Sequence, residues 1–159
     1  MSFTMDAEGI SVQLTIRGYE PSCRENWDDQ WCKCDFTFRS GDWLNYHKEN
    51  DEVFLSCEVE ALEGMLSKML NNQLEEEKEL GFIEPDFEFH FYPQQEFTNI
   101  GCEWRIYFWD DEGALTCNYL AITLSREDME ALRDYLLHVM KAGSFNMPEE
   151  HERQSHIPE

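Results

Sequence analysis

Hydrophobic and polar residues alternate along two stretches of the first half of the chain, residues 10–16 and 31–40. In the first stretch every second residue is aliphatic, and in the second Cys and Phe alternate with charged and hydroxyl side chains. Alternation with a period of two is typical of a strand that has one buried face. The polar segment between them contains Pro21 and predicts a long loop. After the turn-rich stretch SGDWLNYHKENDE, a short strand is expected at residues 53–56.

Apolar residues at helical spacing follow in two places. Leucines and methionines recur every three or four positions over residues 57–74, with Ser56 as the expected N-cap. A second helix is expected to begin after Ser125, where Asp128 at the third helical position predicts a capping box, and to end at Gly143. The charge run EEEKE over residues 75–79 fits a solvated turn after the first helix.

Three further strands are predicted between the helices. Residues 87–92 and 102–109 alternate in polarity, and the DDEG segment after them is typical of a hairpin turn. The return strand, residues 114–124, is apolar on both sides and is therefore expected in the centre of the sheet.

This order of elements predicts an α+β fold, with an antiparallel sheet of about six strands and two helices packed on one face. Strands and helices follow in the order βββα-βββα. We expect a single domain over residues 1–143, followed by a polar, flexible tail over residues 144–159.

The composition adds a strong excess of acidic residues to this picture. The chain of 159 residues contains 34 Asp and Glu against 12 Lys and Arg, so its formal net charge is −22. Such a charge repels phosphate groups, and we expect no direct binding to nucleic acid or to anionic membranes. A basic protein partner would be attracted by the same field. The alternative is that the charge serves only solubility.

Six cysteines are present, but the first ten residues lack the basic and apolar regions of a secretory signal. We therefore expect free thiols, buried in the strands, in a protein of the reducing cytoplasm. The pair Cys32 and Cys34 has no second pair that would complete a zinc site, so no metal is expected. The sequence also lacks a GxSxG, P-loop or GxGxxG motif, and neither an enzymatic activity nor a cofactor is predicted.

The face of the sheet opposite the helices is the sharpest candidate site. Tyr, Trp and Arg are enriched at binding hot spots, and this face would carry them among charged side chains. One alternative is a small-molecule or hydrolytic site built from its Glu, His and Arg side chains, and another is a self-associating subunit, such as a homodimer. A loop or the tail could also cover this face, or inward and outward could be exchanged. The predicted residues are Glu88, His90, Tyr92, Glu103, Arg105, Tyr107 and Trp109.

Two acidic turns with neighbouring aromatics extend this candidate surface. In the segment RENWDDQWCKCDFTF, Trp27 and Trp31 flank the carboxylates of Asp28 and Asp29. These tryptophans could anchor a partner, or they could pack the long loop onto the sheet. The second turn, in the predicted hairpin, contains Asp110, Asp111 and Glu112.

Several of these segments resemble the WapI-type immunity proteins of bacterial polymorphic toxin systems. WDDQWCKC is similar to the start of that family's second strand, and LSCEVEALEGML to its first helix. GFIEPDFEFHF is similar to the Phe-x-Glu-Pro approach to the middle strands, and LSREDMEALRDYL to the closing helix. The likeness runs in order from about Glu8 to Leu137. The cysteines, the SGDWLNYHKENDE stretch and the tail depart from the family pattern.

This resemblance implies a cytoplasmic, non-catalytic antitoxin that binds and blocks the toxic domain of a bacterial competitor protein. Such toxic domains are frequently nucleases with basic clefts. An acidic inhibitor would fill such a cleft by charge complementarity. The family offers no catalytic residues to carry over to this chain.

Overall fold

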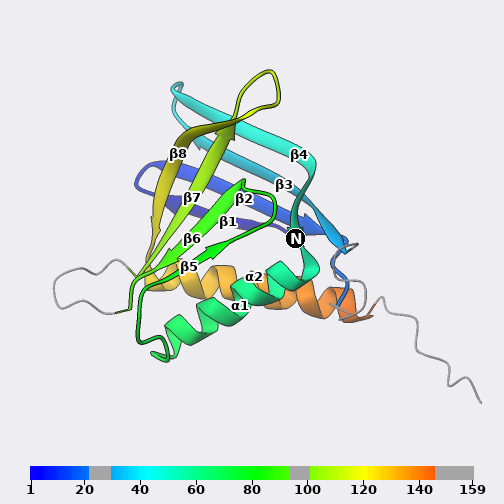
Figure 1. The fold of residues 1–159 in the computed structure, drawn as a ribbon, viewed down its shortest axis with the longest axis vertical. Coiled ribbons are helices and arrows are strands. Elements are labelled where there is room, and N and C mark those ends of the chain that lie inside the picture. Colours follow the sequence, from blue (N-terminus) through cyan, green and yellow to red (C-terminus); the bar gives the residue numbers. More distant parts are fainter. Residues whose placement is uncertain (22–29, 94–100, 146–159) are drawn as a thin grey trace, which may run out of the picture.

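The computed structural model describes residues 1–21, 30–93 and 101–145, and in these it forms eight strands and two helices (Figure 1). The predicted α+β class is confirmed. The elements are β1 (Phe3–Ala7), β2 (Ile10–Arg17), β3 (Trp31–Ser40), β4 (Leu44–Leu55), α1 (Ser56–Leu70), β5 (Lys78–Gly81), β6 (Phe87–Phe91), β7 (Cys102–Trp109), β8 (Leu115–Leu124) and α2 (Arg126–Phe145).

The strands form two antiparallel sheets of four, where the sequence predicted one sheet of about six strands. Sheet A has the order β1-β2-β3-β4, and sheet B has the order β5-β6-β7-β8. Each sheet therefore comes from one continuous half of the chain and is followed directly by a helix. An alternating pattern marks a strand with one buried face, but it does not reveal which strands share a sheet, so the division escaped prediction.

Three edge strands, β1, β4 and β5, are missing from the prediction or longer than predicted, because they are short or charged. β1 pairs with β2 across a tight turn in which Glu8 and Gly9 both have positive φ, as a two-residue hairpin requires. β4 begins at Leu44 and takes in most of the segment predicted as turns. β5 includes Lys78 and Glu79 from the predicted solvated turn. Charged side chains are normal on edge strands, where they mask the apolar alternation.

The prediction that residues 114–124 are central in the sheet was wrong. β8 is the last strand of sheet B and pairs only with β7 among the described strands. Its apolar residues on the outer side are exposed to solvent, whereas Ile122 and Leu124 are buried.

The core lies between the two sheets and is rich in aromatic rings. Phe36 of sheet A meets Phe87 of sheet B with ring centroids 4.9 Å apart, and Phe38 meets Trp104 at 5.5 Å. All four side chains are almost completely buried. The two helices lie side by side across one end of this pair of sheets and add their leucines to the same core (Figure 1). The sequence predicted a different arrangement, in which both helices pack on one face of a single sheet.

The capping box predicted at the start of α2 is confirmed. The Ser125 N–H donates to Asp128 Oδ2 at 3.1 Å, and the Asp128 N–H donates to Ser125 Oγ at 3.1 Å. The helix runs to Phe145, past Gly143. At α1 the expected cap was wrong, because Ser56 is the first helical residue and the N-cap is Leu55.

The first helix is also shorter than its apolar pattern suggested. It ends at Leu70, not at residue 74, and Asn72 then adopts a positive φ that turns the chain away. The guanidinium of Arg126 donates to the Leu70 carbonyl oxygen at 2.7 Å, so the start of α2 caps the end of α1.

Candidate protein-binding surface

The outer face of sheet B carries six of the seven residues that the sequence predicted for it, all except Trp109. On β6 and β7 the inward side chains Phe87, Phe89, Cys102 and Trp104 are buried, which confirms the predicted alternation. The strand register places His90 beside Glu103 and Glu88 beside Arg105. On β8, Thr123, Ala121 and Tyr119 continue the rows that begin with Glu103, Arg105 and Tyr107.

His90 lies between two carboxylates on this face. Its Nε2 contacts Glu88 Oε1, and its Nδ1 lies 3.4 Å from Glu79 Oε1. The residue is only 5% exposed, and its ring stacks on Tyr92 with centroids 6.4 Å apart. Glu79, Glu88 and His90 each offer one atom that could bind a metal, and these three atoms lie within 4.8 Å of one another. Both ring nitrogens already contact carboxylate oxygens, and exposed acidic groups commonly cluster in this way without a metal ion.

Arg105 organises the other half of the same face. Its Nε donates to Glu103 Oε1, and this bond is the main reason that the pKa of the guanidinium is raised. The guanidinium also lies 5.0 Å from the ring centroid of Tyr119, within the range of a cation–π contact. Tyr107 packs beside Tyr119 and its hydroxyl donates to Glu88 Oε2 at 3.3 Å. Charged and aromatic groups are thus held in fixed positions.

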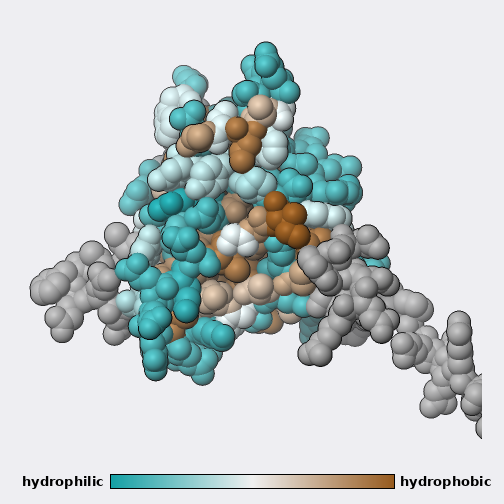
Figure 2. Space-filling model, viewed as in Figure 1, coloured by the Kyte–Doolittle hydropathy of each residue, from teal (hydrophilic) through white to brown (hydrophobic). Residues whose placement is uncertain are grey.

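The electrostatic balance of this face is acidic. Burial and then the charge of Glu103 raise the pKa of Tyr92, and Glu77 and Glu79 act in the same direction. Hydrophilic residues also gather over the connection between α1 and β5, which contains Glu75, Glu76 and Glu77 (Figure 2). Arg105 alone does not offset these carboxylates, so the face carries an excess of negative charge.

Trp109, predicted for this face, instead bridges the two sheets. The register of β7 and β8 shifts between Tyr107 and Trp109, and a bulge of this kind re-aims the side chain that follows it. Its Nε1 donates to Asp86 Oδ1 at 2.9 Å, and Lys48 Nζ of sheet A lies 4.4 Å from its ring centroid. Asp86 is 2% exposed, and this burial raises the pKa of its carboxyl group. Nothing in the sequence around Asp86 indicates this role.

The acidic residues of the turn between β7 and β8 differ in their roles. The carboxylate of Asp110 accepts hydrogen bonds from the Glu112 N–H at 3.0 Å and the Ala114 N–H at 2.8 Å, so it shapes the turn. Asp111 and Glu112 are exposed. Their side chains can therefore contact a partner.

The predicted loop site lies mostly outside the described residues. Trp27, Asp28 and Asp29 fall in the segment 22–29. Trp31 begins β3, where it is half-buried and pairs with Leu55, so it belongs to sheet A and not to the outer face of sheet B.

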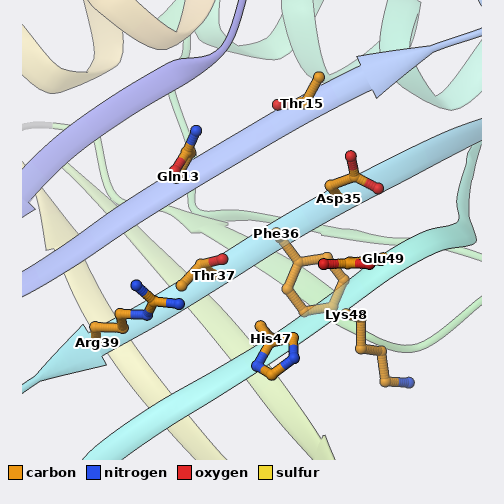
Figure 3. Close-up of a pocket in the computed structure, with 9 residues that line it drawn as sticks. All are labelled: Gln13, Thr15, Asp35, Phe36, Thr37, Arg39, His47, Lys48 and Glu49. Atoms are coloured by element: carbon orange, nitrogen blue, oxygen red, sulfur yellow. The ribbon is translucent and has the colours of Figure 1, made fainter.

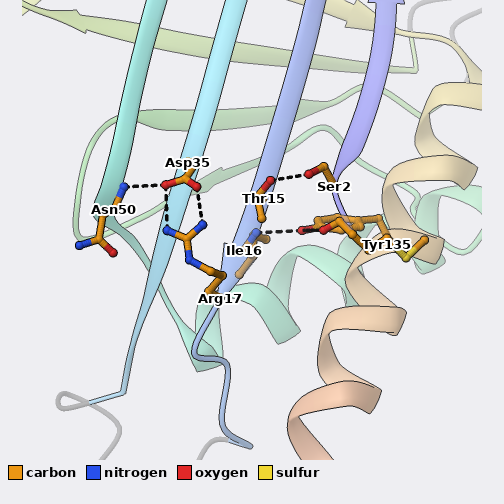
Figure 4. A network of polar contacts seen from close by, with 8 residues as sticks. Ser2, Thr15, Ile16, Arg17, Asp35, Asn50 and Tyr135 are labelled. Atoms are coloured by element: carbon orange, nitrogen blue, oxygen red, sulfur yellow. Dashed lines mark hydrogen bonds and ion pairs between the residues drawn. The ribbon is translucent and has the colours of Figure 1, made fainter.

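A shallow polar hollow of about 220 Å³ lies on the other sheet (Figure 3). Polar side chains of β2, β3 and β4 line it, among them Gln13, Thr37, Arg39 and His47. Close by, Asp35 accepts hydrogen bonds from the Arg17 guanidinium and the Asn50 N–H (Figure 4). The small-molecule alternative required a pocket beside His90, and this hollow does not lie there.

The buried cysteines behave as core residues. Cys32, Cys34 and Cys102 are free and buried. Burial raises the pKa of the Cys32 thiol to about 11 and raises the pKa of the other two as well. Neutral, inert thiols are the expected state at these sites.

Comparison with known proteins points in one direction. The model of the immunity protein WapI-like family matches residues 3–142, which include both sheets and almost all of α2. A comparison with curated proteins finds no match. Neither of the two described helices has the length and apolar character to cross a bilayer. The family match confirms the resemblance seen in the sequence motifs, and the chain belongs to the WapI-like immunity protein family.

Proposed function

We propose that this protein binds and neutralises a cognate bacterial toxin domain that has a basic surface, such as a nuclease. The observation that carries the proposal is the family match over residues 3–142. The net charge of −22 supports the basic character of the partner, because opposite fields speed encounter and align the two surfaces. We infer that the protein acts in the cytoplasm, where an incoming toxin would meet it, and that it inhibits by binding, without turnover.

The outer face of sheet B and the neighbouring acidic turn are the proposed contact surface. Glu88, Glu103 and the turn residues Asp111 and Glu112 supply negative charge, and the tyrosines supply apolar contact area. His90 contacts Glu88 and Arg105 pairs with Glu103, so these two carboxylates are held in place. Because Glu88, Glu103, His90 and Arg105 are engaged with one another, the face suits recognition better than hydrolysis. Trp27, Asp28, Asp29 and Trp31 remain a predicted second contact.

Co-expression with the neighbouring toxin tests the function. The probe is the C-terminal domain of the large secreted protein encoded beside the gene for this chain. We expect this domain to arrest growth alone and to be harmless when the protein is co-expressed. Growth arrest that persists despite soluble co-expression would overturn the proposal, as would the absence of such a gene.

A pair of charge reversals tests the electrostatic part. The double variant Asp111→Lys and Glu112→Lys should lower the association rate constant by several-fold at low salt, with a smaller effect at 0.5 M NaCl. The matched control is Asp42→Lys with Glu49→Lys, which makes the same charge change in the turn between β3 and β4 and in β4, where both residues are exposed. Equal slowing by both variants would mean that only net charge matters and not this surface.

A further inference from the structure

The four edge strands of the two sheets are not protected equally. β4 carries Lys48, Glu49, Asp51 and Glu52, β5 carries charged residues over half its length, and β1 contains an aspartate. Proteins place charges on edge strands to prevent another strand from pairing there. β8 has ten residues, LTCNYLAITL, and not one is charged. Since 29% of the residues of the chain are charged, the absence of any charge from β8 sets it apart from the other three edge strands.

The unprotected edge is also exposed and apolar. Leu115 and Tyr119 are 42% and 46% exposed, and Cys117 and Ala121 are exposed as well. These four residues alternate along the strand, and Tyr119 and Ala121 lie in register with Tyr107 and Arg105 on the outer face. Leu115 pairs with Trp109, beyond the register shift. β8 forms one side border of sheet B in Figure 1, and it pairs with no second strand in the described part of the chain.

Charge argues against a second copy of this chain as the occupant of the edge. The acidic turn Asp110–Glu112 precedes β8, and Glu127 and Asp128 follow it at the start of α2. If two β8 strands paired antiparallel, the turn of each copy would lie beside the helix start of the other. Parallel pairing would place turn beside turn. Both arrangements bring carboxylates together, between molecules that each carry −22.

A basic partner would be attracted by the acidic residues at both ends of β8. An extended segment with apolar residues in its middle and Lys or Arg at its ends would pair its backbone with β8. Its end charges would meet the acids that flank the strand. Its side chains would lie next to Tyr119, at the border of the acidic outer face already described. Strand addition of this kind takes affinity from main-chain hydrogen bonds and specificity from alternate side chains.

From these observations we infer that β8 is a docking strand, to which the toxin domain adds an apolar, extended segment flanked by Lys or Arg. This inference rests on the proposed function. It adds the mode of binding, a fifth strand on sheet B, to the acidic face.

The test introduces acids into the docking strand, so that charge and strand pairing predict opposite results. Leu115→Glu and Tyr119→Glu each make the protein more negative, which would favour a basic partner if charge alone decided affinity. Edge pairing predicts at least a tenfold loss of affinity, because an acid blocks the apolar contact with the added strand. The matched control is Leu137→Glu on α2, where the leucine is 43% exposed, and it should leave the affinity within twofold of wild type.

Hydrogen exchange of the complex supplies a readout that does not depend on affinity. Using the neighbouring toxin domain as the probe, we expect the amides of residues 115–121 to exchange more slowly in the complex than in the free protein. Unchanged exchange there, or unchanged affinity in both β8 variants, would overturn the docking strand while leaving the immunity function intact. A wild-type protein that fails to bind the domain would overturn both.

Sedimentation of the protein alone provides the remaining outcome. A concentration-dependent dimer that Leu115→Glu abolishes would identify a second copy as the occupant and overturn the inference. A monomer at all concentrations supports it.

Discussion

Asp35 shows how one surface side chain holds an irregular strand. The pairing of β3 with β4 shifts between Cys34 and Phe36, and beside this shift Asn50 adopts φ +53°. The Asp35 carboxylate accepts the Asn50 N–H at 2.7 Å and pairs with the Arg17 guanidinium (Figure 4). The side chain thus supplies the bond that the ladder lacks at the shift.

This bond predicts a pH-dependent stability. Arg17 and then the Asn50 N–H lower the pKa of Asp35 from 3.8 to about 2. The stabilisation is therefore complete above the ordinary pKa and disappears as the pH falls through about 2. Because the Asp35 side chain is 37% exposed, Asp35→Asn should cost only about 0.5–1 kcal/mol at pH 7. Urea unfolding from pH 7 down to pH 2 checks this, and a cost that is constant over that range would contradict it.

Asp86 predicts the opposite dependence. Burial raises the pKa of its carboxyl group above 3.8, so its ionisation opposes folding near neutral pH. Asp86→Asn can still accept the hydrogen bond from Trp109 Nε1, and we expect it to be the more stable protein at pH 7. This advantage should shrink as the pH falls through the raised pKa toward 3.8. Parallel denaturation curves at pH 7 and pH 4 measure it. A variant that is less stable at pH 7 would show that the ion pair of Asp86 Oδ1 with Lys48 Nζ, 3.5 Å away, outweighs the desolvation of the carboxylate.

Sequence patterns predicted most side-chain directions but failed at a bulge. The alternation of β6 and β7 placed Glu88, His90, Glu103 and Arg105 correctly on one face. Trp109 was misplaced because it follows a register shift, where β8 has two more residues than β7, and its ring meets Asp86 and Lys48 instead. A bulge depends on how two strands pair, and the sequence of one strand alone does not contain that information.

At the scale of elements, two helical glycines meet different surroundings. Gly64 in α1 has open space where a Cβ would lie. A Cβ on Gly143 in α2 would lie 2.6 Å from the backbone oxygen of Tyr19. The close approach of α2 to the segment after β2 therefore depends on the missing side chain at Gly143.

These glycines make a matched pair of substitutions. Gly64→Ala should stabilise the protein by about 0.5–1 kcal/mol, because alanine favours the helix and restricts the unfolded chain. Gly143→Ala should destabilise it by about 1–3 kcal/mol, because backbone atoms must shift to admit the methyl group. Thermal unfolding of the two variants beside wild type measures both effects. If both alanines stabilised the protein, α2 could move away from Tyr19 at little cost.

Strands at sheet borders were the elements that the sequence predicted least well. The charges of β4 and β5 resembled solvated turns, although each strand has a paired neighbour on one side. The apolar run of β8 resembled a central strand, although its outer side chains are exposed. A strand at the border of a sheet can be charged although it is paired, or apolar although it is exposed, because one of its edges and one of its faces meet solvent or a partner. Polarity along the sequence is therefore a poor guide to such strands.

At the scale of the whole molecule, the excess of 22 negative charges should oppose folding by self-repulsion. We expect the melting temperature at pH 7 to rise by several degrees between 20 mM and 0.5 M NaCl, since salt screens exposed charges. The double variant Asp111→Lys and Glu112→Lys should gain less from the same salt. Differential scanning fluorimetry measures both proteins, and a melting temperature that falls with salt would show that surface ion pairs outweigh the repulsion.

The class of fold and the family could be predicted from sequence, whereas the layout of the sheets could not. The order of strands and helices and the motifs from Glu8 to Leu137 were sufficient for the first two. The division into two sheets depends on contacts such as Phe38 with Trp104, between residues 66 positions apart. Neither residue carries a local signal for the other.

The continuous origin of each sheet has a consequence for how the chain folds. Neighbouring strands of a sheet are also neighbours in sequence, so the hairpins of each half can form through short-range contacts. The aromatic contacts between the halves span much longer loops, and closing such loops costs more entropy. The slow step of folding should therefore be the docking of two preformed meanders, and burial of Trp104 should report it.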